Sequence, residues 1–183
     1  MSQRRSNVTS TIVNSAMRDG IPFGALLMAC SATTIFGDKL PILALLSYLL
    51  LASIPFVVYR LQRRYYVNQG YLPFHAEVWF YGAVLNLCGA LLCALGTWIM
   101  LHYLRPYYMS EIMQQFAEFA KTYKKAMGSD NYKLIRDIVD KNIYPSLAEY
   151  VMTMFWYTSF LGAVGSAITA IFARKVKPNS KQL

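Results

Sequence analysis

The sequence predicts an all-α integral membrane protein with four transmembrane helices and an extracytoplasmic amphipathic helical insert between the third and the fourth. Three observations support this prediction. Hydrophobic residues make up 56% of the 183 and charged residues only 15%, which is too apolar for an ordinary soluble domain. Several apolar runs reach the length of about 20 residues at which a helix crosses a hydrocarbon core of about 30 Å. A charged, helix-periodic segment separates two of these runs.

The whole chain, 1–183, is expected to form one membrane domain. The expected spans are residues 21–36, 40–59, 78–101 and 147–172. The last three are clear from their length alone. The first is shorter and contains Pro22 and Gly24, although its helix could extend backward through Val13 and Ala16 and leave Arg18 at the headgroups.

The first span also allows a second interpretation. Arg4 and Arg5, an apolar run and then Leu27-Met-Ala-Cys30 are similar to a bacterial lipoprotein signal in which Cys30 would be lipidated after cleavage. The short, proline-containing apolar run and the long basic leader favour a span instead. The intact mass of the purified protein distinguishes the two. Cys30, Cys88 and Cys93 form no Cys-x-x-Cys pair, so the sequence suggests neither disulfides nor a zinc site.

Basic residues beside the spans predict the orientation. Lys and Arg gather in the N-terminal arm, after the second span and in the tail 173–183, whereas the basic residues of the insert 102–146 are largely offset by acidic ones. By the positive-inside tendency, both termini are expected in the cytoplasm. The insert would then lie outside.

The insert contains two short amphipathic helices. In the first, apolar side chains recur at helical spacing and predict a partner or interface face: Ile112, Phe116, Phe119 and Tyr123. Gly128 is a helix stop and Ser129 or Asp130 a helix start. This face could lie on the bilayer surface, on the tops of the spans or on a second protein chain.

Two stretches carry a family resemblance: Gly70-Tyr-Leu-Pro-Phe-His-Ala-Glu77 before the third span, and Tyr103-Leu-Arg-Pro-Tyr107 after it. With the charged insert and a glycine-rich last span, they resemble domain-of-unknown-function family 4199, small bacterial inner-membrane proteins with four spans. The similarity extends from about Ile21 onward. It implies the topology and no activity. It further implies, as partners, membrane-associated family 2 glycosyltransferases.

Three polar residues in or beside the spans are candidates for function: Asn86, His102 and Glu149. Asn86 is expected to form an interhelical hydrogen bond, with a substrate contact as the alternative. Glu149 closes an S-x-x-E capping box with Ser146. Alternatively it meets His102, because both are expected at the outer ends of adjacent spans, and such a pair could respond to pH.

Small residues predict close helix packing. Gly89 and Gly96 form a ridge on the third span, and Gly162 and Ser166 form one on the fourth. Such ridges let helix backbones approach closely. Packing within the bundle is the simpler interpretation, and self-association through the fourth span is the alternative.

A cytoplasmic basic collar is expected to contact anionic lipid headgroups. Its members are Arg60, Arg63, Arg64, Arg174 and Lys175. The collar accounts for most of the net charge of +9, so nucleic acid is not expected as a partner.

No nucleotide loop, metal-ligand motif or catalytic signature is present in the sequence, and no cofactor is expected. The expected function is therefore that of a non-enzymatic accessory or assembly subunit for a membrane-associated partner. A homo-oligomer is also compatible with the sequence. The alternative function is a small dimeric transporter or lipid flippase, because four spans enclose little pathway alone.

Overall fold

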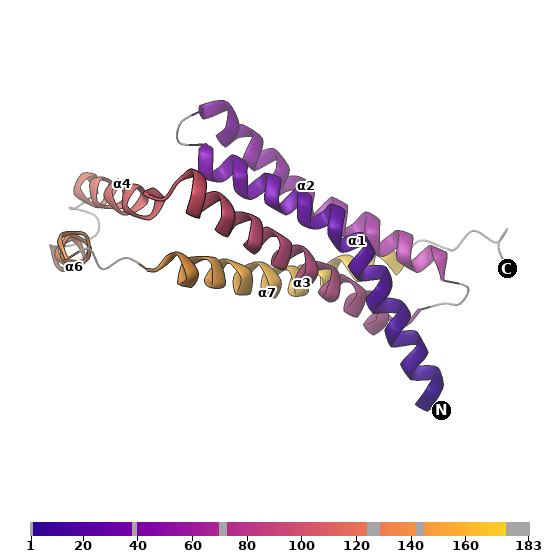
Figure 1. Cartoon of the computed structure of the whole chain (residues 1–183). Helices are drawn as coiled ribbons and strands as arrows, with labels where there is room; N and C mark the ends of the chain where they lie inside the picture. Colours follow the sequence, from indigo (N-terminus) through magenta and orange to yellow (C-terminus); the bar gives the residue numbers. More distant parts are fainter. Residues whose placement is uncertain (1, 38–39, 70–72, 124–128, 142–144, 175–183) are drawn as a thin grey trace. The chain divides into compact units, whose positions relative to one another are not determined.

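The computed structural model describes all residues except 1, 38–39, 70–72, 124–128, 142–144 and 175–183. The described residues form helices and no strand: α1 (Ser2–Phe36), α2 (Pro41–Asn68), α3 (His75–Ile99), the π-helix η1 (Met100–Leu104), α4 (Tyr108–Thr122), α6 (Ser129–Asp140) and α7 (Leu147–Arg174). Figure 1 shows these helices, which their contacts divide into two units. Unit 1 contains Met1–Thr97 and Met154–Leu183, and unit 2 contains Trp98–Thr153.

Four helices are long and apolar enough to cross a membrane, which confirms the predicted fold class. The stretches concerned are Thr9–Phe36, Pro41–Asn68, His75–Leu104 and Leu147–Ala173. α1 contains 35 residues with Pro22 inside it, so it is about 50 Å long and exceeds the thickness of the hydrocarbon core. It begins well before the expected Ile21.

α2 also differs from the expectation. Pro41 occupies its first position, where a missing amide proton costs least. The helix continues past Tyr59 to Asn68, so Arg60, Arg63 and Arg64 belong to a helix and not to a connection. The reason is that the apolar periodicity persists beyond the arginines, with Tyr65 and Tyr66 both buried.

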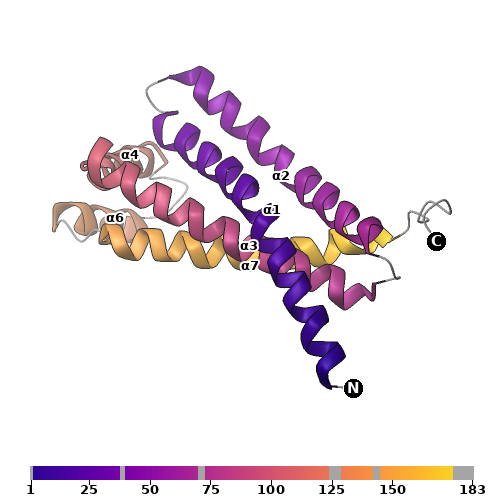
Figure 2. The same cartoon turned by 45° about the vertical axis from the view of Figure 1, so that its right-hand side comes forward.

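Contacts between helices fix their directions within unit 1 (Figures 1 and 2). Gly20 and Gly24 of α1 approach Cys88 and Leu92 of α3, so these two helices run in the same direction. Along α3, Gly82 approaches Ser166 of α7, while Asn86 approaches Gly162, so α7 runs in the opposite direction. The start of α1 and the end of α7 therefore lie at the same end of unit 1.

The core of unit 1 lies where α1, α2 and α3 meet. Phe23 of α1, Val58 of α2 and Leu85 of α3 belong to one buried cluster. A second cluster joins the end of α2 to α3 and α7 through Tyr66, Val78 and Ala170. Large apolar side chains remain exposed along α2 and α7, as expected for helices that face lipid.

Candidate functional site

A buried amide joins three helices of unit 1. The Gln62 side chain, from α2, is fully buried. Its Nε2 donates to the carbonyl oxygens of Val78 in α3, at 3.3 Å, and Ser166 in α7, at 2.9 Å. Its Oε1 accepts a hydrogen bond of 2.6 Å from the Thr169 hydroxyl of α7. Because every polar hydrogen and the oxygen of this amide have partners, it stabilises the bundle without exposing an unsatisfied group.

Sequence reasoning missed Gln62 because it ended the second span at Tyr59. The sequence nevertheless indicated that the helix continues past Tyr59. Val58, Gln62, Tyr65 and Tyr66, the buried residues of α2, follow one another at spacings of four, three and one, which extends a single helical face. A polar residue on the apolar face of a continuing helix would have indicated an interhelical bond.

Gly82 of α3 makes room for this amide. A Cβ atom at Gly82 would lie 2.5 Å from the Ser166 Cβ and would also collide with Gln62 Nε2. A second hydrogen bond holds α7 against α3 beside it, from Trp79 Nε1 to the Ala163 carbonyl oxygen at 3.0 Å. Glycine is therefore required sterically at position 82.

A carboxylate lies at the same level, where α1 meets α3. Tyr81 is fully buried, and its hydroxyl donates to Asp19 Oδ2 at 2.6 Å. The Tyr81 ring stacks on Tyr65 of α2, with the centroids 4.4 Å apart. Asp19 is only 15% exposed, and Arg18 Nε lies 3.9 Å from its other oxygen. The carboxylate is thus held by a hydrogen bond inside the bundle and by a weak ion pair at its edge.

Asn86 does not form the expected interhelical hydrogen bond. Its Nδ2 donates to the carbonyl oxygen of Gly82, one turn earlier in the same helix, at 2.8 Å. Its side chain packs across the interface against Gly162 of α7, where an added Cβ would lie 2.5 Å from Asn86 Cγ. Asn86 therefore contributes to the contact between α3 and α7 through close packing against Gly162.

The other small residues pack α3 against α1. A Cβ at Gly89 would lie 2.6 Å from the Phe23 ring, and one at Gly96 would lie 2.7 Å from Met28 Sδ. Further along, the hydroxyls of Ser31 and Thr97 are 2.7 Å apart and share a hydrogen bond. Ser166 uses its own hydroxyl locally, on the Gly162 carbonyl. The small residues of α3 (Gly89 and Gly96) and of α7 (Gly162 and Ser166) thus all pack against neighbouring helices of unit 1.

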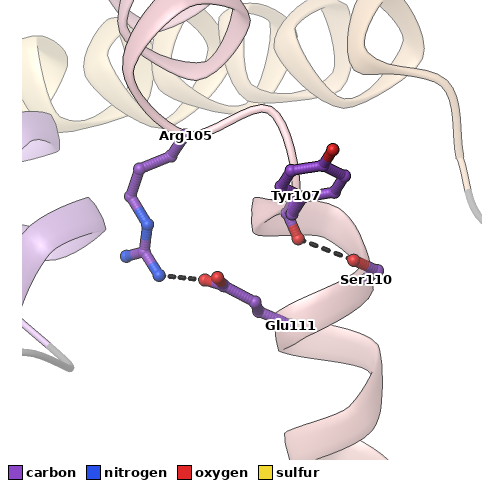
Figure 3. Close-up of polar contacts among 4 residues, drawn as sticks. All are labelled: Arg105, Tyr107, Ser110 and Glu111. Atoms are coloured by element: carbon purple, nitrogen blue, oxygen red, sulfur yellow. Dashed lines mark hydrogen bonds and ion pairs between the residues drawn. The ribbon is translucent and has the colours of Figure 1, made fainter.

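Unit 2 contains an elbow, residues 105–107, between η1 and α4 (Figure 3). The Arg105 amide donates to the Met100 carbonyl at 3.2 Å, five residues back, which is the π-helical pattern. The Arg105 guanidinium pairs with Glu111 of α4 and lies over the Tyr108 ring, 5.0 Å from its centroid. Ser110 donates to the Tyr107 carbonyl at 2.8 Å. These contacts fix the direction in which α4 leaves the elbow.

The face of α4 beyond the elbow is partly exposed. Phe116, Phe119 and Tyr123 are each about half exposed, at 54%, 52% and 50%, whereas Ile112 is half-buried. The rings of Phe119 and Tyr123 pack on each other with centroids 4.5 Å apart. α4 therefore presents an aromatic surface, which we call the α4 aromatic face (Phe116, Phe119 and Tyr123).

His102 and Glu149 form no hydrogen bond or ion pair with each other. The His102 ring stacks on Trp98 with centroids 5.0 Å apart and meets the edge of Tyr103. Glu149 Oε2 accepts from the Ser146 amide at 2.7 Å, and the Ser146 hydroxyl accepts from the Glu149 amide at 3.2 Å. This reciprocal capping box occupies the carboxylate at the start of α7.

Three arginines of the expected collar line a depression on α2. Arg60, Arg63 and Arg64 are exposed, and the depression measures about 500 Å³. Arg174 ends α7, and nothing is described of its side chain. Lys175 lies outside the described residues.

Cys30, the residue of the lipoprotein alternative, lies inside α1 with its sulfur 3.9 Å from the Ser47 carbonyl of α2. Across the described part of the chain, no group of three or more His, Cys, Asp or Glu side chains could hold a metal ion.

Taken together, the fold and these contacts define the class: a multi-pass α-helical membrane protein whose polar groups join its helices. Compared with known families, residues 18–175 match the family described as "Protein of unknown function (DUF4199)". The chain belongs to this family, which confirms the resemblance carried by the sequence. No curated protein matches the chain, and neither does any solved structure.

Proposed function

We propose that this protein is a non-enzymatic accessory subunit of a bacterial inner membrane, which docks a membrane-associated partner protein on its α4 aromatic face. The single observation that carries the proposal is that half-exposed aromatic face (Phe116, Phe119 and Tyr123). Aromatic side chains are enriched among the residues that dominate protein–protein binding energy.

The elbow favours a protein partner over passive contact with lipid. The Arg105–Glu111 pair and the cation–π contact with Tyr108 fix the start of α4, and the rings of Phe119 and Tyr123 already pack together. A preorganised surface loses less conformational entropy on binding. Rigid presentation of a few aromatic rings is a property of binding surfaces, whereas an interfacial helix needs only its apolar area.

The orientation is part of the proposal. Arg60, Arg63 and Arg64 adjoin Gln62, which contacts α7 near its end, so these arginines lie at the end of unit 1 where α1 begins and α7 finishes. The positive-inside tendency puts that end in the cytoplasm. The partner class that we propose is a lipid-linked glycosyltransferase system, which the family resemblance suggests.

The transporter or flippase alternative finds less support. Unit 1 buries more polar groups than the sequence suggested, among them Gln62, Thr97 and Ser31. These groups bond to one another or to carbonyl oxygens of neighbouring helices. Polar groups arranged in this way hold helices together and leave few free partners for a substrate.

A site-specific photocrosslinker tests the docking proposal. Placed at Phe116 in cells, it is expected to give a discrete adduct with another membrane-associated protein. Gln114 is exposed on the opposite side of α4 and is the matched control, from which that adduct should be absent. Adducts with lipid alone, with a second copy of this chain, or equally from both positions would contradict the proposal.

A further inference from the structure

The depression on α2 that Arg60, Arg63 and Arg64 line is not part of the α4 aromatic face. It is lined by one face of the helix: Val57, Arg60, Leu61, Arg63, Arg64, Val67 and Asn68. Arg60 and Arg64 are one turn apart on that face, and Arg63 flanks them. This open depression of about 500 Å³ thus combines three guanidinium groups with aliphatic side chains.

Among the described residues, no carboxylate forms an ion pair with these three arginines. Arg60, Arg63 and Arg64 form no hydrogen bond or ion pair with any residue that the structure describes, in contrast to Arg18 and Arg105, which pair with carboxylates. The carboxylate of Glu77, at the start of α3, caps the Phe74 amide at 3.1 Å. Three like charges within about one turn repel one another, so an external anion would be stabilised there.

The position along α2 indicates where that anion lies. From Pro41, the first residue of α2, to Arg60 the helix rises about 28 Å, which is close to the thickness of a hydrocarbon core of about 30 Å. The arginines therefore emerge at the depth of lipid headgroups. On the membrane side of the depression, Leu45, Leu49 and Phe56 are exposed, at 63%, 63% and 74%.

We infer that this depression binds the phosphate headgroup of one anionic glycerophospholipid, with its acyl chains along Val57 and the exposed apolar surface of α2. Guanidinium groups bind phosphate oxygens bidentately. A free phosphate ion would satisfy the charges but would leave the aliphatic wall without a partner. The inference does not depend on the docking proposal, because it concerns a different surface and needs no second protein.

Native mass spectrometry of the purified full-length protein tests the inference. Titration with phosphatidylglycerol and, separately, with phosphatidylcholine should show tighter binding of the anionic lipid. Each single change, Arg60→Gln, Arg63→Gln or Arg64→Gln, should weaken that binding about fivefold, and the triple variant should weaken it about a hundredfold (~1 kcal/mol per basic residue). The two lipids have similar acyl chains, so the difference reports the headgroup site.

A matched control removes the same number of charges elsewhere. Lys121, Lys133 and Lys141 are exposed on unit 2, and their triple change to Gln should leave phosphatidylglycerol binding unchanged. Equal binding by the wild type and the Arg60→Gln variant, which alters one exposed side chain and preserves the fold, would overturn the inference. Displacement of the lipid by inorganic phosphate at equal concentration would assign the site to a free anion and would overturn it too.

Discussion

Two helices of unit 1, α2 and α3, differ in burial in the opposite way from helices of soluble proteins, in which the more apolar helix is the more buried one. The most apolar window of α2 has a higher mean hydropathy than that of α3, yet 6% of it is buried in the protein against 44% for α3. The buried face of α3 is composed largely of small and polar residues, including Gly82, Asn86, Gly89 and Thr97.

The reason for this difference is the solvent. In a bilayer, lipid tails are as apolar as a leucine side chain, so burial of an apolar residue against protein gains little, and close packing and interhelical hydrogen bonds decide which face turns inward. Leu45 and Leu49 of α2 therefore remain exposed, while Gln62 of the same helix is fully buried. For this protein, small and polar residues indicate the packed face better than hydropathy does.

The largest expected effect comes from two phenylalanines that differ only in where they lie. Phe23 is 1% exposed and packs on Gly89, whereas Phe56 is 74% exposed. Phe23→Ala should reduce the free energy of unfolding in detergent by about 3 kcal/mol, because it leaves a cavity. Phe56→Ala should change it by less than about 0.5 kcal/mol. Similar losses for both variants would show that apolar area, and not packing, stabilises the bundle.

The second-largest expected effect on stability comes from replacing a packed glycine and comparing it with an unpacked one. Gly82→Ala should destabilise the protein by about 1–3 kcal/mol, because the new Cβ would collide with Gln62 and Ser166. Gly165 has no atom within 4 Å of the corresponding position, so Gly165→Ala should be neutral or stabilising by up to about 1 kcal/mol through helix propensity. Thermal unfolding of both variants in the same detergent measures the difference, and a neutral Gly82→Ala would refute the steric requirement.

The smallest of the three effects concerns the buried amide. Gln62→Leu should cost about 1–2 kcal/mol, since it removes the hydrogen bonds that join α2 to α3 and α7. Thr34→Val is the control, because the Thr34 hydroxyl donates only within its own helix, to the Cys30 carbonyl at 2.9 Å. Reversible unfolding monitored by tryptophan fluorescence gives both values. An unchanged Gln62→Leu variant would mean that α2 is held by its apolar contacts alone.

The site could be predicted only in part. The S-x-x-E sequence before α7 indicated the capping box between Ser146 and Glu149, and the structure has that geometry, because a cap depends on residues three apart. The partner of Asn86 was not predictable in this way. Its amide bonds within α3 and its side chain packs against Gly162 of α7, and the residue opposite a given side chain is not encoded locally.

The sequence by itself determined what depends on length and periodicity: four membrane-spanning helices, and two amphipathic helices between the third and the fourth. These features are local, since each helix satisfies its own backbone hydrogen bonds in lipid. Only the tertiary structure decided that α2 continues to Asn68 and that Gln62 joins three helices. It also decided that Tyr81 holds Asp19 and that three arginines share one depression. Those features depend on which helix faces which, and interhelical packing sets that arrangement between residues far apart in the chain.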